Sequence, residues 1–405
     1  MTVNAGLPRD NAGNTSGTGA VGIIGCGIIG AMLAYELSKA GVAVTVWEAQ
    51  PRPATGATGA ALGLLMAVCS SKAKGDLVDL RLASLKRYDS LIAELEALTG
   101  IKILYNREGI LCVYAQGDRT KAESLAAIRQ EQGFGLEVQG AEQLNALPGQ
   151  WRGAYGVYSP ADRAVHPVHL VNALVAGAGH YGAKFYWSTP ISDLESVLDG
   201  NSRQKIILTA GMGCNDLLAK FLALRHGVAL DTLGQHCRSE IAENLLGKNL
   251  LQPVGGHGLR LRLPAKESPL TQVIHMVMAD GTDFNLVPLH HDQFAANEYW
   301  LGATIEFDVN PDLSDFKLSF SRFQESAANP DRWQWLLSQA EEFSPWLAEA
   351  EILSAWHGYR PRPQQARSPI LGILPEEPRI LLAIGHYRNG LLMAPITAQI
   401  IGDLL

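Results

Sequence analysis

The sequence predicts an α/β fold shared between two domains, and three observations support this. The chain has 405 residues, more than one hydrophobic core usually serves. Residues 20–48 run as strand, glycine turn, helix and strand, which is typical of a parallel βαβ unit. Residues 283–289 and 298–308 alternate like strands on either side of a short polar loop. We therefore expect one parallel-sheet domain and one further domain.

The βαβ unit begins with an apolar strand over 20–24, and a helix is expected over 31–39. A second strand over 42–48 ends in an acid, Glu48, followed by Ala49. The glycines between the first strand and the helix stand in GxGxxG spacing and are Gly25, Gly27 and Gly30. Such glycines allow a tight turn, close approach of a pyrophosphate to the backbone, and close packing of helix on strand. This is a Rossmann-like dinucleotide-binding pattern.

The N-terminus of the helix that follows this turn is expected to bind phosphate. Its first N–H groups, near Ile28 and Ile29, have no partner within the helix, and the helix dipole is positive there. Glu48 can accept hydrogen bonds from ribose hydroxyls, and an acid at this place disfavours NADP. The acid does not separate NAD from FAD.

The next stretch does not continue as another strand–helix unit. It is small and glycine-rich, then apolar, which favours close approach of the backbone to a flat ligand. The residues expected to contact this ligand are Thr58, Gly59, Ala60, Ala61 and Gly63. The alternative, a flexible linker, fits the Ala and Leu content poorly.

Composition excludes several classes of protein. A net charge of −7 argues against a nucleic-acid partner, because phosphate binding needs a basic face. Five scattered cysteines predict reduced core thiols in the cytoplasm and no structural metal site; they are Cys26, Cys69, Cys112, Cys214 and Cys237. Residues 1–19 read as a disordered leader, and no apolar run reaches the length of a membrane span. The pair His290-His291 is interpreted as part of a polar loop.

Two longer helices are expected outside the βαβ unit. Leucines recur at helical spacing over 81–100, where Gly100 is the stop signal. The segment 329–347 predicts a second helix that ends near Ser344-Pro345.

Several separated blocks, together with the βαβ unit, resemble the FAD-dependent D-amino-acid oxidase superfamily. The likeness runs from about residue 20 to the end and is greatest to the glycine oxidase branch associated with thiamine biosynthesis. The blocks are "DRAVHPVHLVNALVAGAGHYGAKFYWSTPISDL", "IILTAGMG", "WLGATIEF", "WHGYRPRP" and "GHYRNGLLMAPIT". The last block is the most specific of them.

The resemblance implies that the two domains are interleaved along the chain. An FAD-binding domain would contain 20–95, 150–225 and 345–405. A substrate domain, of α+β type on an antiparallel sheet, would contain 96–149 and 226–344.

The resemblance also implies the cofactor, FAD, and further residues that contact it. No cysteine stands near "HGYRP", so we expect FAD to be held without a covalent bond. The further contact residues are Ile191, Ala210, Gly211, Arg360, Gly385, His386, Tyr387, Arg388, Asn389, Gly390 and Leu391.

The chemistry implied is hydride transfer from the α-carbon of a small amine to N5 of the flavin. A substrate carboxylate beside the flavin needs an arginine, and Arg360 is the expected anchor. Arg388 is the second candidate, either gripping the carboxylate or shaping the site. His386 and Tyr387 are interpreted as packing or hydrogen-bonding residues rather than as an acid and a base. The other residues expected at the substrate are Met66, Phe284 and Asn285.

Some positions depart from the family pattern. Gly213 stands where an aromatic is usual, Gly63 to Met66 replace a Gly-Met-Leu-Gly, and "RPRPQQARSP" replaces an Arg-Pro followed by Thr-Pro-Asp. The predicted activity is oxidation of glycine, sarcosine or a small D-amino acid by O2, giving an imine, then an oxo acid, ammonia and hydrogen peroxide. The alternatives are a dehydrogenase that passes electrons to a quinone or carrier protein, and a flavin-binding subunit without turnover. A homo-oligomer is left open.

Overall fold

The computed structural model describes residues 19–198, 204–226, 250–265, 269–290, 293–307, 329–364 and 369–405. Nearly all of the expected leader 1–19 lies outside these ranges, and so do Cys237 and His291.

The first sheet has six strands in the order β16-β17-β10-β1-β2-β9. These are β1 Val21–Ile24, β2 Val44–Trp47, β9 Lys184–Tyr186, β10 Lys205–Leu208, β16 Ile370–Leu374 and β17 Glu377–Ile384. All neighbours pair in parallel except β16 and β17, which are antiparallel. The predicted βαβ unit is confirmed, with β1 next to β2 at the centre of this sheet.

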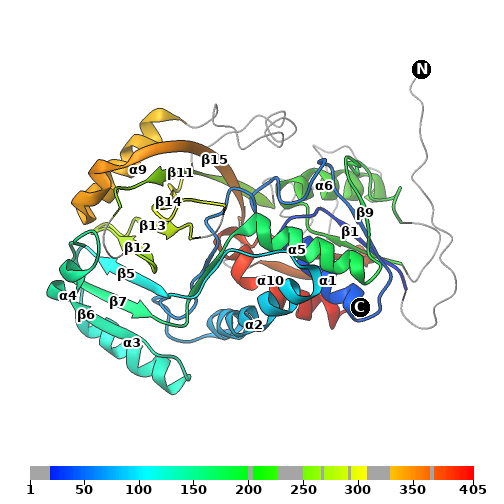
Figure 1. Cartoon of the computed structure of the whole chain (residues 1–405). Coiled ribbons are helices and arrows are strands. Elements are labelled where there is room, and N and C mark those ends of the chain that lie inside the picture. The colour runs from blue at the N-terminus through cyan, green and yellow to red at the C-terminus, as the bar shows by residue number, and fades with distance from the viewer. Residues whose placement is uncertain are drawn as a thin grey trace.

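Helices cover both faces of this sheet because its strands are apolar on both sides. Ile23, Ile207 and Leu381 pack in a core with α1 Ile28–Lys39, α2 Asp76–Thr99, α5 Pro167–His180 and α10 Gly390–Gly402. Ile206 and Leu208 face the other way and pack against α6 Cys214–His226. Figure 1 shows α1 and α5 beside one another, with α6 on the opposite side of the strands.

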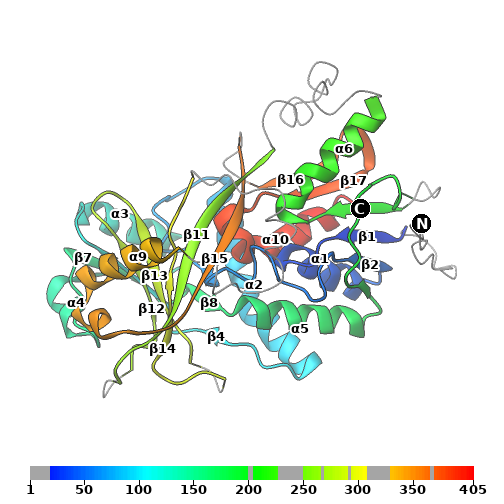
Figure 2. The same ribbon diagram turned by 90° about the horizontal axis from the view of Figure 1, so that it is seen from above.

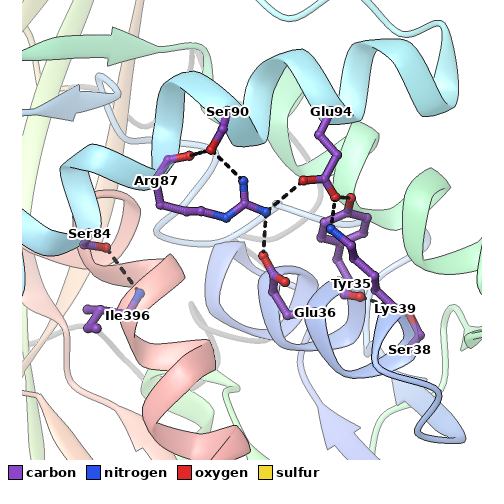
Figure 3. Close-up of polar contacts among 9 residues, drawn as sticks. All are labelled: Tyr35, Glu36, Ser38, Lys39, Ser84, Arg87, Ser90, Glu94 and Ile396. Carbon is purple, nitrogen blue, oxygen red and sulfur yellow. Dashed lines mark hydrogen bonds and ion pairs between the residues drawn. The ribbon is translucent and has the colours of Figure 1, made fainter.

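Helix α2 joins α1 to α10 through polar contacts at the edge of this core (Figure 3). Arg87 of α2 donates to Glu36 of α1 at 3.3 Å and to Glu94 at 2.9 Å. Ser84 of α2 accepts a hydrogen bond from the N–H of Ile396 at 3.2 Å, beside Pro395, which interrupts the helix interior. Helices α1, α2 and α10 therefore form one packed layer on this face of the sheet.

The second sheet has eight strands in the order β15-β11-β14-β13-β12-β5-β7-β6. These are β5 Ile110–Tyr114, β6 Glu137–Gly140, β7 Tyr155–Ser159, β11 Leu251–Arg262, β12 Val273–Val277, β13 Asp283–Pro288, β14 Glu298–Gly302 and β15 Glu351–Pro363. Its pairs are antiparallel as expected, apart from the parallel pair β5 and β12. The predicted antiparallel sheet is confirmed, and β5 with β12 is its one parallel pair.

The long strands β11 and β15 stand between the two parts of the molecule (Figure 2). On one side lie the remaining strands of their sheet with α9 Pro330–Phe343, and on the other lie α10 and the six-stranded sheet. The remaining elements are a small sheet of β3 Leu64–Leu65, β4 Tyr105–Asn106 and β8 Arg163–Val165, the helices α3 Arg119–Glu131 and α4 Ala141–Ala146, and the 3-10 turns η1 Gly211–Gly213, η4 Pro345–Glu349 and η5 Tyr387–Asn389.

Most expected elements are present with shifted ends. Helix α1 begins three residues before the predicted 31, and α2 begins at Asp76 rather than 81, ending at Gly100 with φ 71°. Helix α9 matches its prediction and is capped by Asn329. β14 stops at Gly302, short of the predicted 308. β7 and β15 belong to the eight-stranded sheet although they fall in the ranges predicted for FAD binding, and the domain boundaries stay a prediction.

Two further expectations concern the cysteines and the membrane. Cys26, Cys69, Cys112 and Cys214 are buried and form no disulfide, as expected for small core residues. Within the described ranges, every helix is too short or too polar to cross a bilayer.

Two buried charges fix the segment that follows β3. The carboxylate of Asp162 accepts the N–H groups of Ala67, Val68 and Cys69 at 2.7–2.9 Å. Arg129 of α3, which is fully buried, donates to the carbonyls of Val68, Ser70, Lys72 and Ala73 at 2.7–3.2 Å. The backbone polar groups of 67–73 thus find side-chain partners in place of a strand ladder.

Replacement of Arg129 by Met tests this role. Several buried carbonyls would lose their donors, so we expect Arg129→Met to lower the free energy of unfolding by about 3 kcal/mol or more. The measurement is urea unfolding followed by circular dichroism. Arg119→Met on the same helix is the control, since Arg119 makes an exposed ion pair with Glu123 worth about 0.5 kcal/mol. Equal losses in the two variants would contradict the proposed role.

Candidate active site

The turn before α1 allows no side chain at two of its glycines. Gly25 has φ +99°, and a Cβ there would lie 2.8 Å from the Cα of Ala210. A Cβ on Gly30 would lie 2.0 Å from the carbonyl oxygen of Gly25. Thr209 adds a side-chain bond to this oxygen, at 2.8 Å. The turn therefore packs against Thr209 and the backbone of Ala210, whereas Gly211 has space around it and a positive φ of 57°.

The N-terminus of α1 has no side-chain cap from its own N-cap residue, Gly27. Instead, the N–H of Ile28 donates to Oγ1 of Thr58 at 3.1 Å. Thr58 therefore lies at the positive end of the helix, where a phosphate was expected. A Cβ on Gly27 would come within 3.1 Å of the same hydroxyl, so this space is kept narrow by both residues. An anion is favoured at this helix end, with Ile29 and Gly30 in the first turn.

Glu48 lies at the end of β2 and holds the turn. Its Oε2 accepts the N–H of Cys26 at 2.7 Å, and its Oε1 accepts the N–H of Gln50 at 2.9 Å. Burial raises the pKa of Glu48, and these N–H groups work against that rise. Each carboxylate oxygen keeps a second lone pair for a hydroxyl donor. The residues present, including Ala49 beside the acid, therefore fit the ribose and pyrophosphate of FAD.

The small residues after this unit approach the strand that carries Arg360. Trp356 of β15 donates from Nε1 to the carbonyl of Ala60 at 3.0 Å. A Cβ on Gly358 would lie only 2.4 Å from the Cβ of Ala60. The neighbouring small residues of the same segment are Gly59, Ala61 and Gly63. Met66 packs with Ala60 and Trp356 in one cluster, so the structure brings it to this face. Ile191 packs against the core beneath α6, on the far side of the six-stranded sheet from α1.

Arg360 of β15 is half-buried, and only Nη1 of its guanidinium has hydrogen-bond acceptors in the described part of the chain. Its Nη1 donates to the carbonyls of Gly255 at 2.9 Å and Thr304 at 3.1 Å. Burial, and then the charge of Arg388, lowers the pKa of Arg360. None of the ion pairs within the described ranges involves Arg360. The orientation of the Arg360 guanidinium is therefore fixed, and its charge is not paired with a carboxylate of the described part of the chain.

A carboxylate behind Arg360 was not predicted from the sequence. Glu306 accepts from Nδ1 of His257 at 2.7 Å and from the hydroxyl of Thr304 at 2.5 Å. Burial raises the pKa of Glu306, but these two donors outweigh it and bring the pKa to about 2. Glu306 also pairs with Gly255 through both backbone groups, at 2.9 and 3.1 Å. The acid therefore holds in place both carbonyls that bind Arg360.

Glu306, His257 and His357 have side-chain atoms within 4.8 Å of one another, a grouping that could hold a metal ion. Both ring nitrogens of His257 are already engaged, since Nε2 accepts the N–H of Asn329 at 3.0 Å. The Nδ1 facing Glu306 then carries the proton and has no lone pair for a metal. Burial, followed by the charge of His257, lowers the pKa of His357 to about 4. The geometry favours a hydrogen-bonded group over a metal site.

The C-terminal turn places its residues in different surroundings. Gly385 has φ +74° and packs on Pro363. Tyr387 also has a positive φ, and its ring centroid lies 5.8 Å from Cζ of Arg362. His386 points into the core and contacts Oγ1 of Thr397 at 2.9 Å. Burial lowers the pKa of His386 to about 3, so a buried packing role agrees with its surroundings better than acid–base chemistry. Asn389 and Gly390 begin α10, and the carbonyl of Leu391 accepts the hydroxyl of Tyr88.

Arg388 makes a bidentate ion pair with Asp283, the first residue of β13. Nη1 lies 3.1 Å from Oδ2, and Nη2 contacts Oδ1. Burial works against the charge on Arg388, but the bonded carboxylate raises the pKa of Arg388 above its ordinary value. The same contact lowers the pKa of Asp283, against the effect of burial. This partner was not predicted, because 105 residues separate Asp283 from Arg388.

The two expected substrate residues on β13 lie on opposite faces. Asn285 donates to the carbonyl of Gly302 at 3.2 Å and contacts Nδ1 of His275 at 2.8 Å. Phe284 packs in the core under α9, edge-on to Phe343 at 6.0 Å. Strand alternation requires this, since successive side chains point to opposite faces. The structure therefore brings Asn285, but not Phe284, to the face that carries Asp283.

Comparison with known proteins agrees with this geometry. A family model described as "FAD dependent oxidoreductase" matches residues 20–404. The glycine oxidase of Geobacillus kaustophilus is 28% identical over 393 residues, covering 95% of this chain and 92% of that protein. A "Bifunctional protein ThiO/ThiG" from Synechocystis is 29% identical over 401 residues, and the match spans 96% of this chain but only 52% of that protein.

Solved structures support the fold. The crystal structure of glycine oxidase from Geobacillus kaustophilus superposes with a TM-score of 0.73 at 24% identity, covering 95% of this chain and 93% of that one. At this level of identity the likeness concerns the fold alone.

The buried histidines predict a pH-dependent stability. Because the pKa of His386 is near 3 when folded and about 6.5 when unfolded, the unfolded chain takes up the proton first as pH falls. Its contribution to stability is complete above pH 6.5 and decreases by about 1.4 kcal/mol per pH unit below it. Urea unfolding between pH 7 and 5 should show a falling midpoint.

His386→Gln should reduce that slope, since glutamine does not titrate, and the remaining slope comes from other groups such as His357. His180→Gln, at an exposed position at the end of α5, is the control and should keep the wild-type slope. An unchanged slope in His386→Gln would contradict the assignment.

Proposed function

The chain belongs to the family of FAD-dependent oxidoreductases matched by residues 20–404, and from this we propose that it oxidises a small amino acid such as glycine, sarcosine or a small D-amino acid, with O2 as acceptor. The glycine oxidases among its relatives support an amino-acid oxidoreductase that binds FAD. Bound FAD would supply the hydride acceptor for the α-carbon and the route of the electrons to O2, which would give hydrogen peroxide. Hydrolysis of the imine would give an oxo acid and ammonia, or methylamine where the substrate is sarcosine.

The observation that carries the proposal is the half-bound guanidinium of Arg360. Its Nη1 is held by the carbonyls of Gly255 and Thr304, which fixes the plane of the group. The remaining N–H groups of a planar fork suit a carboxylate, which they can bind in a bidentate manner. A substrate carboxylate would also provide the negative charge that a buried arginine requires.

Arg360 is a better anchor than Arg388 for this carboxylate. The guanidinium of Arg388 is already paired with Asp283, so a substrate carboxylate would have to displace a carboxylate of the protein. Arg360 needs no such displacement. We assign Arg388 to the shape and charge of the site, together with Asn285 and Met66.

The chain's own residues would orient the amine rather than deprotonate it. His386 is turned into the core, and the pKa of His275 is lowered by burial, with Asn285 as its hydrogen-bond partner. Hydride transfer from a neutral amine needs no strong base, only a fixed position of the α-carbon. The residues on this face fit that requirement.

An anaerobic screen of amino acids is the first test of the proposal. The flavin of the purified protein should bleach with a small amino acid, and admission of air should restore the absorption within seconds. Slow recovery in air together with fast recovery by a quinone would move the assignment to a dehydrogenase. Absence of bleaching with every amine would overturn the proposal in favour of a binding subunit.

Arg360→Ala should retain FAD but lose about 2–4 kcal/mol of transition-state stabilisation, measured as kcat/KM. The loss should fall mainly on KM, because the anchor binds substrate in the ground state as well. Arg262→Ala is the control, since Arg262 is an exposed arginine on the neighbouring strand, paired with Glu351 at 2.8 Å. Unchanged kinetics in Arg360→Ala would remove Arg360 from the site.

A further inference from the structure

We propose that Asp283 determines the substrate selectivity of this site. By occupying the guanidinium of Arg388, it restricts the site to amino acids with a single carboxylate and rejects those with a second acidic group. This inference rests on the proposed function, because it assumes that a substrate carboxylate binds at Arg360.

The ion pair occupies the end of the Arg388 guanidinium. The two side chains meet through two N–O contacts, Nη1 to Oδ2 and Nη2 to Oδ1. A bidentate pair fixes the orientation of Arg388 and offsets its charge, so the guanidinium does not offer a second carboxylate an uncompensated positive charge. It would also face the negative charge of Asp283.

The pair is accessible rather than part of the core. The side chain of Arg388 is 37% exposed and that of Asp283 is 19% exposed. Both charges act on Arg360, Arg388 lowering its pKa and Asp283 raising it. Asn285, two residues along β13 from Asp283, donates to the carbonyl of Gly302, and Arg360 donates to the carbonyl of Thr304, two residues after Gly302. A ligand held by Arg360 would therefore lie near the pair of Asp283 and Arg388.

The charges around Arg360 suit one carboxylate. Three positive side chains, Arg81, Arg360 and Arg388, are coupled through their charges, and two negative ones, Asp283 and Glu306, act on Arg360. Asp283 is paired with Arg388 directly, so the charge of Arg360 is the one left for a ligand carboxylate.

Removal of the charge of Asp283 should therefore change selectivity in one direction. In Asp283→Asn, the fork of Arg388 becomes available, and the excess positive charge rises by one unit. Ligands with two carboxylates should gain affinity, whereas ligands with one carboxylate should change little.

The test uses the FAD-loaded protein and two probes without an amino group, propionate and succinate. Binding of each is followed by the change in flavin absorption, which requires no turnover. We expect the ratio of the dissociation constant of propionate to that of succinate to rise about tenfold or more in Asp283→Asn. The kcat/KM of aspartate relative to that of alanine of the same configuration should rise as well.

Asp280→Asn is the matched control, because Asp280 is an exposed acid in the same hairpin that only accepts the N–H of Thr282. It should leave the ratio at the wild-type value. The double variant Asp283→Asn, Arg388→Gln should also lose the gain for succinate, which assigns the effect to the freed fork. If Asp283→Asn does not fold, Asp283→Ala replaces it.

An unchanged ratio in a folded, flavin-loaded variant that still binds propionate overturns the inference and leaves the proposed function standing. A wild-type protein that binds succinate as well as propionate also overturns it. A wild-type protein that binds neither carboxylate, and is not bleached by any amino acid, removes the proposed function itself.

Discussion

The pairing of β11 with β15 is the interaction on which the rest of the site depends. Its antiparallel register runs from Leu251 opposite Pro363 to Arg262 opposite Glu351 and sets Val254 opposite Arg360. Because of this register, the carbonyl of Gly255 lies within hydrogen-bond reach of the guanidinium of Arg360. The same strand β15 meets Ala60 through Trp356. One strand thus joins the expected flavin segment to the expected carboxylate anchor.

Burial of several arginines near one another imposes the next constraint. Arg81 and Arg360 both have pKa values lowered by burial and by the charge of Arg388. Without compensation, the folded chain would hold like charges close together in partly buried positions, which is unfavourable. Asp283 bonds to Arg388 directly, and Glu306 acts on Arg360 from behind the carbonyls. The fold therefore tolerates the positive charge that a carboxylate-binding site needs.

The sequence predicted the parts of the structure that local patterns determine. The turn of Gly25 and Gly30 and the acid Glu48 follow from short spacing, and their packing explains the residue types. The ion pair of Arg388 with Asp283 could not be predicted, because it joins segments that only the tertiary fold brings together. Phe284 and Asn285 show a third limit: the resemblance indicated a stretch of strand, whereas the face of each side chain depends on which sheet surface meets α9. Glu306 stands two residues after the "GAT" of the block "WLGATIEF", and its position behind Arg360 depends on the tertiary fold.

Stability and selectivity come from the same contact at Arg388. Without Asp283, the guanidinium of Arg388 would lie unpaired just before α10 and would repel the guanidinium of Arg360. Asp283 removes that repulsion in the protein without substrate, so the ion pair contributes to folding before any ligand binds. The same ion pair affects binding. To reach Arg388, a second carboxylate of a ligand would have to displace Asp283. A chain that places two arginines close together can therefore leave one of them for the substrate and must neutralise the other itself.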